Sequence, residues 1–352
     1  MTSPAPIEID GHQVGAGQTP FVIAEVSGNH NGSLDRALEI IDAIAESGAQ
    51  AVKFQTYTAD TITIDAKGPQ FQIRADHGLW GGRTLYDLYQ EAHTPWEWHA
   101  PMFERARERG LTPFSSPFDP TAVELLESLD APAYKIASAE VIDLPLIRLV
   151  ASTGKPMIIS SGMATLGEID RALSAARDGG CTEMVLLACT ASYPADPADA
   201  RLLSIPTLQE AFGIPIGLSD HTEGIGVSVA AVALGAVALE KHVTLARSDG
   251  GVDSDFSLEP HELTALVRES AAARKAVQPP RFGPTESERD TLALRRSLYV
   301  VADVAAGDPV TRDNVRSIRP AGGLPTDEIE KVLGRSFSQA VERGTPLTWD
   351  LI

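Results

Sequence analysis

Short apolar runs rich in β-branched and aromatic residues alternate with amphipathic segments from residue 21 to about residue 276. This alternation is typical of βα units arranged around a parallel sheet. The pattern predicts eight strands, at residues 21–27, 51–57, 112–116, 133–138, 156–162, 184–190, 214–221 and 237–244. Eight successive parallel strands favour a closed (β/α)8 TIM barrel, since the first strand lacks the Gly-rich turn of a dinucleotide-binding open sheet.

The segments between these runs predict helices. Apolar residues share one helical face within residues 33–47, namely Leu34, Leu38, Ile41 and Ile44. Residues 165–177 open with a capping box, in which the side chains of Thr165 and Glu168 each bond the other residue's backbone N–H. We therefore expect a helix after the first and after the fifth predicted strand.

Two stretches interrupt this rhythm. Residues 58–94 are too many for a simple βα connection, and insertions of this length commonly serve a function. After residue 276, a Pro-rich segment leads into short apolar runs separated by turns that contain Gly or Pro. We expect three parts: a catalytic barrel at 1–276, a linker at 277–290 and a small β-rich domain at 291–352.

The 352-residue chain has a net charge of −19. Nucleic acids and anionic membranes are bound by clusters of Lys and Arg, so this charge argues against both as partners. No run approaches the roughly 18 apolar residues of a membrane-spanning helix, and the N-terminus lacks a signal-peptide pattern, so we expect a cytoplasmic protein. Cys181 and Cys189 lie in or beside apolar runs, and we expect both to be buried core thiols.

The active site of a TIM barrel lies at the carboxyl ends of its strands. His221 and His242 end the seventh and eighth predicted strands, which are neighbours, so the two imidazoles are expected to converge. Two imidazoles with open positions suit a Lewis-acid cation such as Mn2+, Fe2+, Zn2+ or Mg2+. The alternative is that each histidine only caps its strand through a hydrogen bond.

Lys53 and Lys135 lie inside the second and fourth predicted strands, where a cation is costly to bury without an anion. Together with the hydroxyls of Ser138, Ser160 and Ser219, they predict a site for a phosphate and a carboxylate. A Schiff-base aldolase, with one of the two lysines as nucleophile, is an alternative.

Acidic residues lie close to these strand ends. Glu25 ends the first strand and Glu140 follows the fourth. They either transfer protons and hold substrate hydroxyls, or form structural salt bridges with the two strand lysines. Asp253 lies in the loop after the eighth strand, where composition alone favours a turn residue over a substrate ligand.

The ordered strand-end motifs AEVSGNHNGS, VKFQTY, PFSSPF, YKIAS, GLSDHT and ALEKHVT closely resemble those of the sialic acid synthase family. The tail, with RRSLYV and VRSIRPAGGL, is similar to that family's C-terminal antifreeze-like (SAF) domain, a small β-clip fold. The resemblance implies a metal-dependent condensation of phosphoenolpyruvate with an N-acetylated sugar aldehyde. The products would be a nine-carbon 2-keto acid and phosphate.

The resemblance also implies roles for individual residues. His221 and His242 would hold a divalent metal, expected to be Mn2+ with Mg2+ or Co2+ as alternatives, and Glu140 would lie beside the reacting carbons. The residues implied for phosphoenolpyruvate are Lys53, Lys135, Ser138 and Ser219, to which the strand pattern adds Ser160. Those implied for the sugar are Glu25, Gln55, Tyr193 and Asp253. Arg319 of the RPAGG turn would reach into a partner's barrel and contact the sugar there, so a domain-swapped homodimer is implied.

One position departs from the family motif. Ala191 stands two residues before Tyr193, where sialic acid synthases carry an asparagine. The substitution removes a phosphate contact that Ser192 or a water would have to replace.

The insertion run GLWGGRTLYDLYQEAHTPWEWH resembles the pseudaminic acid synthase branch, whose substrate is 2,4-diacetamido-2,4,6-trideoxy-L-altrose. Its aromatic residues offer apolar surface for the extra acetamido and methyl groups, or pack helices: Trp80, Tyr86, Tyr89 and Trp96. Alternatives are an N-acetylneuraminate synthase that uses N-acetylmannosamine, a legionaminate synthase, and a non-catalytic carbohydrate- or ice-binding protein.

Overall fold

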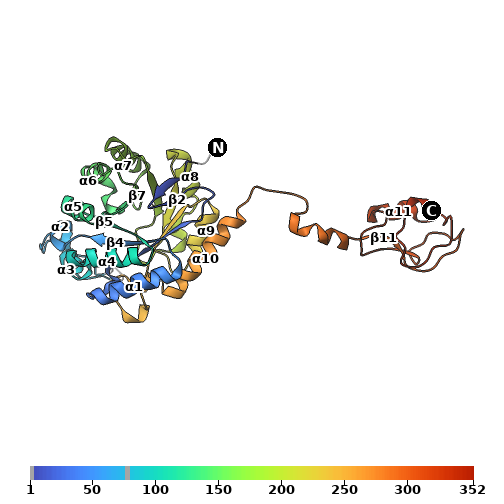
Figure 1. The fold of residues 1–352 in the computed structure, drawn as a ribbon, viewed down its shortest axis with the longest axis horizontal. Helices are drawn as coiled ribbons and strands as arrows, with labels where there is room; N and C mark the ends of the chain where they lie inside the picture. Colours follow the sequence, from blue (N-terminus) through green and yellow to red (C-terminus); the bar gives the residue numbers. More distant parts are fainter. Residues whose placement is uncertain (1–3, 76–79) are drawn as a thin grey trace. The chain divides into compact units, whose positions relative to one another are not determined.

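The computed structural model describes residues 4–75 and 80–352. Contacts divide the chain into two compact units, residues 1–278 and residues 279–352. The first unit contains a parallel barrel surrounded by helices (Figure 1). The second contains a small antiparallel sheet.

Eight parallel strands close the barrel, in the spatial order β10, β3, β4, β5, β6, β7, β8 and β9. They are β3 (Phe21–Glu25), β4 (Ala51–Thr56), β5 (Thr112–Pro117), β6 (Tyr134–Ile136), β7 (Met157–Ser160), β8 (Met184–Cys189), β9 (Ile216–Ser219) and β10 (Ala238–His242). Each overlaps a strand predicted from the sequence, so the predicted TIM barrel is confirmed. The predicted range 133–138 was too long, because the chain leaves the sheet after Ile136 and turns at Ser138.

The barrel strands are buried on both faces, which is why they are almost continuously apolar. In β7, Met157 and Ile159 pack outward against the helices, whereas Ile158 belongs to the cluster inside the barrel. Alternation along the strand then places Ser160 on the inner side, at the carboxyl rim of the barrel. Other polar strand ends reach the interior in the same way.

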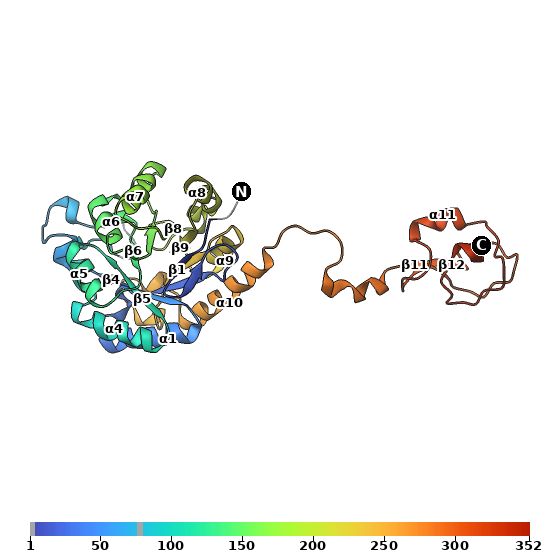
Figure 2. The same ribbon diagram turned by 45° about the horizontal axis from the view of Figure 1, so that its top comes forward.

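Helices between successive strands form the outer layer (Figure 2). They are α1 (Leu34–Ser47), α4 (Trp96–Glu108), α5 (Pro120–Ser128), α6 (Leu144–Ala151), α7 (Leu166–Asp178), α8 (Ser204–Phe212), α9 (Gly226–Ala233) and, after the last strand, α10 (Pro260–Ala276). The predicted capping box is present, with Glu168 N–H bonded to Thr165 Oγ1 at 3.3 Å and Thr165 N–H to Glu168 Oε2 at 2.8 Å. Within the described ranges, no helix is both long and apolar enough to cross a membrane.

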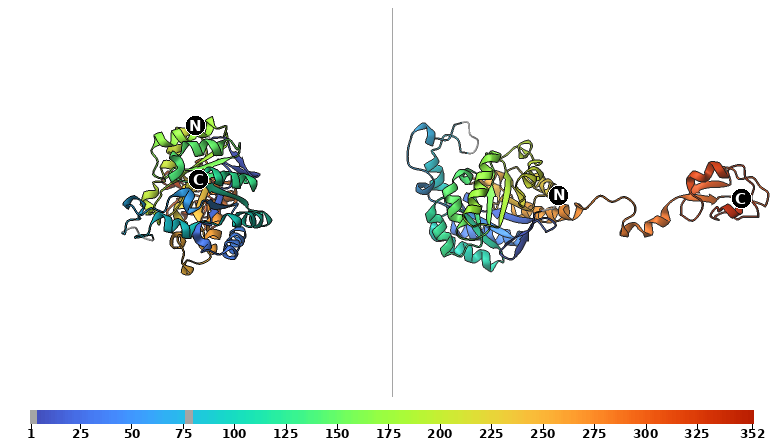
Figure 3. Two further views of the ribbon diagram at one scale, coloured as in Figure 1. Left: turned by 90° about the vertical axis from the view of Figure 1, so that its left-hand side faces the viewer. Right: turned by 90° about the horizontal axis from the view of Figure 1, so that it is seen from above.

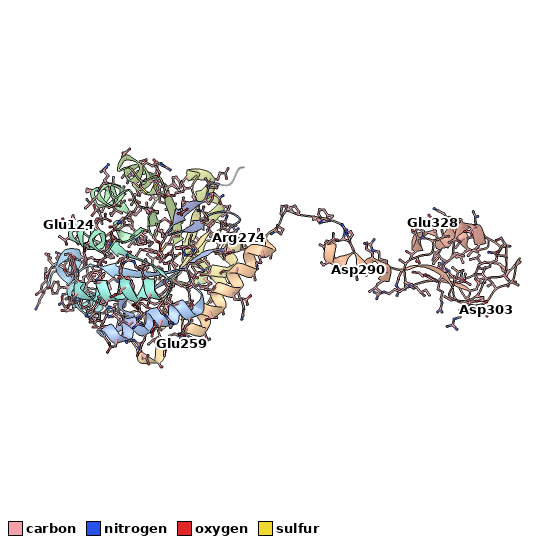
Figure 4. All side chains as sticks on the ribbon, in the orientation of Figure 1. Glu124, Glu259, Arg274, Asp290, Asp303 and Glu328 are labelled. Atoms are coloured by element: carbon pink, nitrogen blue, oxygen red, sulfur yellow. The ribbon has the colours of Figure 1, made fainter. Side chains whose placement is uncertain are left out.

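The last barrel helix, α10, is anchored at both ends by side chains labelled in Figure 4. Glu259 caps its first turn. Arg274, in its last turn, donates a hydrogen bond of 2.7 Å to the Ala236 carbonyl. This bond connects the end of the helix to the start of β10.

An N-terminal hairpin covers the amino end of the barrel. β1 (Ile7–Ile9) and β2 (His12–Val14) pair through an Asp10–Gly11 turn with positive φ at both positions. Ile9 and Val14 are fully buried in the cluster that contains the first residue of β3. The hairpin was not predicted, although IEIDGHQV has the alternation and the turn residues that signal one.

The long connection after β4 forms α2 (Ala59–Ile62) and α3 (Leu85–Ala92). It extends beyond the neighbouring helices, as the right-hand view of Figure 3 shows. Tyr86 of α3 donates to Asp60 of α2 at 3.2 Å, which joins the two helices. Gly78 and Leu79 of the motif noted above lie outside the described residues.

In the second unit, β11 (Ser297–Val300) pairs antiparallel with β12 (Val315–Ile318), and a short helix, α11 (Ile329–Val332), follows. Isolated bridges extend the pairing, for example between Val304 and Val341. Phe337 is buried in a core that belongs to this unit alone. The tail is therefore the small β-rich fold that was predicted.

Candidate active site

A cavity of about 530 Å3 opens at the carboxyl ends of the barrel strands. Its lining includes every site residue that the sequence placed in the barrel: Glu25, Lys53, Gln55, Lys135, Ser138, Glu140, Ser160, Tyr193, Ser219, His221, His242 and Asp253. These residues come from seven different strands or the loops that follow them. The barrel therefore gathers them as the strand count predicted.

Three of these side chains form one row because their strands pair in register. His242 pairs with Glu25, and Glu25 pairs with Lys53, so neighbouring side chains point to the same side of the sheet. Glu25 Oε2 lies 2.9 Å from Lys53 Nζ and 3.2 Å from His242 Nε2, while Gln55 donates to Glu25 Oε1 at 2.7 Å. Burial alone would raise the pKa of Glu25, but Lys53 and His242 lower it below its ordinary value. Glu25 is therefore ionised.

Glu240 was not among the predicted site residues, yet it lines the floor of the cavity between the two lysines. Its Oε1 is 3.3 Å from Lys53 Nζ and 3.2 Å from Lys135 Nζ, and it accepts a 3.0 Å bond from the Ser219 hydroxyl. The salt bridge considered for the lysines thus exists, with Glu25 and Glu240 as the carboxylates. A glutamate inside the apolar run of β10 was the sequence signal that could have identified it.

The pKa values of the two lysines are shifted in opposite directions. Burial opposes the charge of both, but Glu240 and Glu25 raise the pKa of Lys53 above its ordinary value. Lys135 forms its ion pair with Glu240, which it shares with Lys53, and burial lowers the pKa of Lys135. An anion next to Lys135 would favour the charged form of its side chain, so this end of the floor is the better site for an anionic substrate group.

His221 and His242 face each other at the rim, with ring centroids 5.3 Å apart. Both are buried, and His221 Nδ1 lies 2.9 Å from the Thr190 carbonyl, which leaves Nε2 as the ring atom with a free lone pair. Burial lowers the pKa of His242. Burial also opposes protonation of His221, but contacts with Cys189 and the Thr190 carbonyl raise its pKa overall.

The donor set allows a test of the predicted metal. Within residues 4–75 and 80–352, no group of three or more His, Cys, Asp or Glu is arranged as a complete metal site. His242 Nδ1 is nevertheless buried and has no hydrogen-bond partner among the residues described; it lies 3.8 Å from Asp253 Oδ2. These residues fit a cation held by two imidazoles whose other positions are taken by substrate and water.

Several buried polar atoms of the cavity lining have no hydrogen-bond partner among the described residues. They are Ser116 Oγ, Glu140 Oε2, Ser160 Oγ, Glu240 Oε2 and His242 Nδ1. Burial raises the pKa of Glu140 to about 7, so its carboxyl is half protonated near neutrality. Buried polar atoms are almost always paired with protein groups or ordered water, so these atoms are available for hydrogen bonds to a polar ligand or to water.

Asp253 belongs to the cavity wall, although composition had favoured a turn residue. The Ser27 hydroxyl donates to its carboxylate at 2.5 Å, which ties the loop after β10 to the loop after β3. Tyr193 packs on His221 with a centroid distance of 4.4 Å. Both residues therefore border the histidine pair.

The insertion supplies an apolar wall, which we define as Ile62, Ile73, Trp80, Leu85, Leu88 and Tyr89. Two of the four aromatic residues predicted for a sugar contact, Trp80 and Tyr89, thus line the cavity. The other two, Tyr86 and Trp96, are not among the lining residues, and Tyr86 bonds Asp60 instead. Tyr86 therefore joins two helices, which was the stated alternative.

Cys189 was expected in the core, and this was wrong for that residue. Cys181 is buried, whereas Cys189 ends β8 and lines the cavity, 3.4 Å from the Ser138 hydroxyl. Ala191 lines the cavity two residues further on. Ser192 donates to the Pro194 carbonyl and is not part of the lining, so it does not replace the family's asparagine.

Arg319 belongs to the second unit. It borders a hollow of about 710 Å3 together with Arg295 and Arg296. Three guanidinium groups around one hollow make a local cationic surface on a strongly acidic chain.

The family model described as NeuB family matches residues 40–280, and the SAF domain matches residues 295–352. The pseudaminic acid synthase of Helicobacter pylori is 42% identical over 335 residues, covering 95% of this chain and 98% of the relative. The N,N'-diacetyllegionaminic acid synthase of Legionella pneumophila is 34% identical, with 96% of each covered. The crystal structure of N-acetylneuraminic acid synthetase from Leptospira borgpetersenii has a TM-score of 0.73 at 31% identity, and the match covers 82% of this chain and 96% of that one. The chain belongs to the NeuB family and carries a C-terminal SAF domain.

Proposed function

We propose that this protein is a pseudaminic acid synthase. It would condense phosphoenolpyruvate with 2,4-diacetamido-2,4,6-trideoxy-L-altrose to give pseudaminic acid and phosphate. The observation that carries the proposal is a set of buried polar atoms with no hydrogen-bond partner in the described part of the chain, around a cavity that also holds two lysines and two histidines. Identity to the Helicobacter pylori pseudaminic acid synthase supports the choice of product.

The lysine side of the cavity suits phosphoenolpyruvate. Lys135 lies on β6, Ser160 ends β7 and Ser138 follows β6, so one cation and two hydroxyls face the same region. The Ser160 hydroxyl has no partner among the described residues, which leaves it free to donate to a phosphate or carboxylate oxygen. Charge-assisted bonds of this kind are the strongest that a protein offers an anion.

The histidine side suits the sugar. His221 and His242 would hold a divalent cation, and that cation, when bound, would polarise the aldehyde as a Lewis acid. Glu25, oriented by Gln55 at 2.7 Å, presents a carboxylate to the sugar hydroxyls. The apolar wall would take the methyl groups of the two acetamido substituents and of the 6-deoxy carbon.

In the proposed reaction, C3 of phosphoenolpyruvate attacks the aldehyde carbon and a C–C bond forms. Water then adds to C2, and phosphate leaves by cleavage of its C–O bond. Lys53 and Lys135 offset the negative charge of the anion throughout. Glu140 changes protonation near pH 7 and would exchange the protons that the aldehyde oxygen gains and the water loses.

The deciding experiment offers phosphoenolpyruvate with each of three sugars: the 2,4-diacetamido-trideoxy altrose, the legionaminic acid precursor and N-acetylmannosamine. Phosphate release and the product mass are measured. We expect the altrose derivative to give the highest kcat/KM. A higher value with either other sugar would overturn the choice of substrate, and no phosphate release with any of them would overturn the synthase itself.

The Schiff-base alternative is tested separately. Borohydride reduction in the presence of pyruvate would add the mass of the trapped ketoacid to a lysine that forms an imine. We expect the protein mass to remain unchanged, because both lysines are assigned to ion pairing with an anion.

We further propose that Arg319 acts in a partner's barrel within a homodimer, as the resemblance implies. Its place beside Arg295 and Arg296 provides cationic surface for an acidic partner. Mixing the inactive variants Arg319→Ala and His221→Ala would restore activity in heterodimers if the arginine acts between subunits. No recovery after verified subunit exchange would overturn this arrangement.

A further inference from the structure

A second buried ion pair lies directly behind the histidine pair. Lys241 Nζ is 3.3 Å from Asp220 Oδ2, and the two side chains are 0% and 1% exposed. Asp220 precedes His221 in the chain, and Lys241 precedes His242. Each member of the ion pair is therefore the backbone neighbour of one histidine.

The Asp220–Lys241 ion pair and the histidine pair lie on opposite faces of the sheet, because side chains alternate along each strand. Glu240 and His242 line the cavity, so Lys241, between them, points to the opposite face of β10. Asp220 likewise points outward, where its Oδ2 accepts a 2.5 Å bond from Ser228 of α9. The ion pair thus lies between the barrel and its helical layer, out of reach of substrate.

The hydrogen bonds of this pair hold the backbone on both sides of His221. Asp220 N–H donates to the Glu240 carbonyl at 3.0 Å, which continues the pairing of β9 with β10. Asp220 Oδ1 accepts the backbone N–H of Thr222 at 2.9 Å and its hydroxyl at 2.8 Å. Lys241 Nζ donates to the Thr222 carbonyl. Lys241 therefore binds the backbone of Thr222, which follows His221, and the side chain of Asp220, which precedes it.

A buried ion pair of this kind adds little to the free energy of unfolding, because desolvation of the two charges offsets most of their attraction. We propose that Asp220 and Lys241 are positioning residues that set the separation of His221 and His242 and so determine the affinity of the site for a divalent cation. The proposal rests on the proposed function, in which the two histidines hold that cation. Mutation of residues that orient metal ligands typically changes metal affinity by about 10- to 100-fold.

The test measures binding of Mn2+ alone to the full-length protein, by loss of the free-ion signal in electron paramagnetic resonance. Asp220→Asn/Lys241→Met removes both charges, keeps the side-chain volumes and leaves no unpaired charge. We expect its Kd for Mn2+ to rise about 10- to 100-fold while its melting temperature stays near that of the wild type. Excess Mn2+ should restore its kcat.

Two further variants separate the possible outcomes. The control is Glu127→Gln/Lys155→Met, which removes a half-exposed lysine–glutamate pair of 2.6 Å outside the cavity lining and should leave the Kd unchanged. His221→Ala should abolish binding. If the wild type binds no Mn2+, or His221→Ala binds it equally well, the proposed metal function fails. If those two behave as expected but the double variant binds like the wild type, only the positioning role is overturned.

A milder variant keeps the test decisive if the double variant does not fold. Ser228→Ala removes the hydroxyl that bonds Asp220 and leaves the charges in place. We expect a several-fold rise in the Kd for Mn2+. An unchanged Kd would overturn the positioning role.

Discussion

Lys53 on β4 and Glu240 on β10 form a buried ion pair across the intervening strand, with 3.3 Å between Nζ and Oε1. The same carboxylate oxygen lies 3.2 Å from Lys135 Nζ. Glu240 therefore holds both lysines at the cavity floor in position before an anion binds. Preorganisation of this kind avoids the free-energy cost of reorienting charged groups during the reaction.

Glu240→Gln removes this shared negative charge and keeps the shape of the side chain. Loss of one partner from a buried pair costs about 3–5 kcal/mol, so we expect a decrease of this size in the free energy of unfolding. Phosphoenolpyruvate should raise the melting temperature of the variant more than that of the wild type, because its anionic groups restore the balance. The control is Glu127→Gln, from a half-exposed pair with Lys155, which should cost about 1 kcal/mol or less. Equal losses in the two variants would contradict the prediction.

His221→Ala and His242→Ala test the proposed cation. Each removes one of the two imidazoles at the rim, so we expect turnover to be abolished. Chelation of the wild type should do the same, and added Mn2+ should reverse it. His261→Ala, on an exposed part of α10, should have no effect. Full activity in the metal-stripped enzyme would refute the metal role.

The pH dependence of activity should reflect the titration of the Glu140 carboxyl. Burial raises its pKa to about 7, so the carboxyl is neutral below that pH and ionised above it. We expect kcat/KM to change with an inflection near pH 7, and Glu140→Gln, which is always neutral, to lack it. Glu124→Gln on α5 should retain it. An inflection that persists in Glu140→Gln would belong to another group.

His30 should make stability fall in acid. Burial, followed by the nearby His93 and His99, lowers its pKa from 6.5 to about 4. Between pH 6.5 and 4, His30 is protonated in the unfolded chain but remains neutral in the folded chain. The stability that neutral His30 contributes above pH 6.5 is therefore lost as the pH falls towards 4. From neutral pH to pH 4, the free energy of unfolding should fall by about 3 kcal/mol more in the wild type than in His30→Gln.

The control for this comparison is His261→Gln, because His261 is exposed. The free energy of unfolding of this variant should change with pH as that of the wild type does. If His30→Gln also follows the wild type, protonation of His30 does not limit stability in acid.

The N-terminal hairpin should affect stability but not catalysis. Ile9 is fully buried at the amino end of the barrel, opposite the cavity. Ile9→Ala should lower the free energy of unfolding by about 2–5 kcal/mol in a urea titration. Its kcat/KM should equal that of the wild type at a temperature where both are folded. Exposed Glu8→Ala should change neither quantity, and a kinetic defect in Ile9→Ala would show that the hairpin acts on the site.

Local patterns were sufficient to predict the barrel, the α7 capping box and the separate tail. Strand periodicity, helix caps and turn residues depend on neighbours a few positions away, so they can be read without coordinates. The histidine pair was also predictable, because in a parallel barrel the strand order alone brings the ends of the seventh and eighth strands together.

Other features depended on contacts between residues far apart in the chain. The inward or outward direction of Cys189 at the end of β8 decided that it lines the cavity, and packing of α3 decided that Tyr89 does so while Tyr86 does not. Asp253 became a cavity residue through a bond to Ser27, more than two hundred residues earlier.

The sequence by itself therefore determined the fold, the order of the domains and which strand ends line the cavity, because those properties follow from local periodicity and strand order. Only the tertiary structure decided which charges pair. The sequence offered two candidate carboxylates for Lys53, Glu25 and Glu140. The structure adds Glu240, which pairs with both Lys53 and Lys135. Strand register and side-chain direction place that oxygen between two ammonium groups, and neither property is visible in a linear sequence.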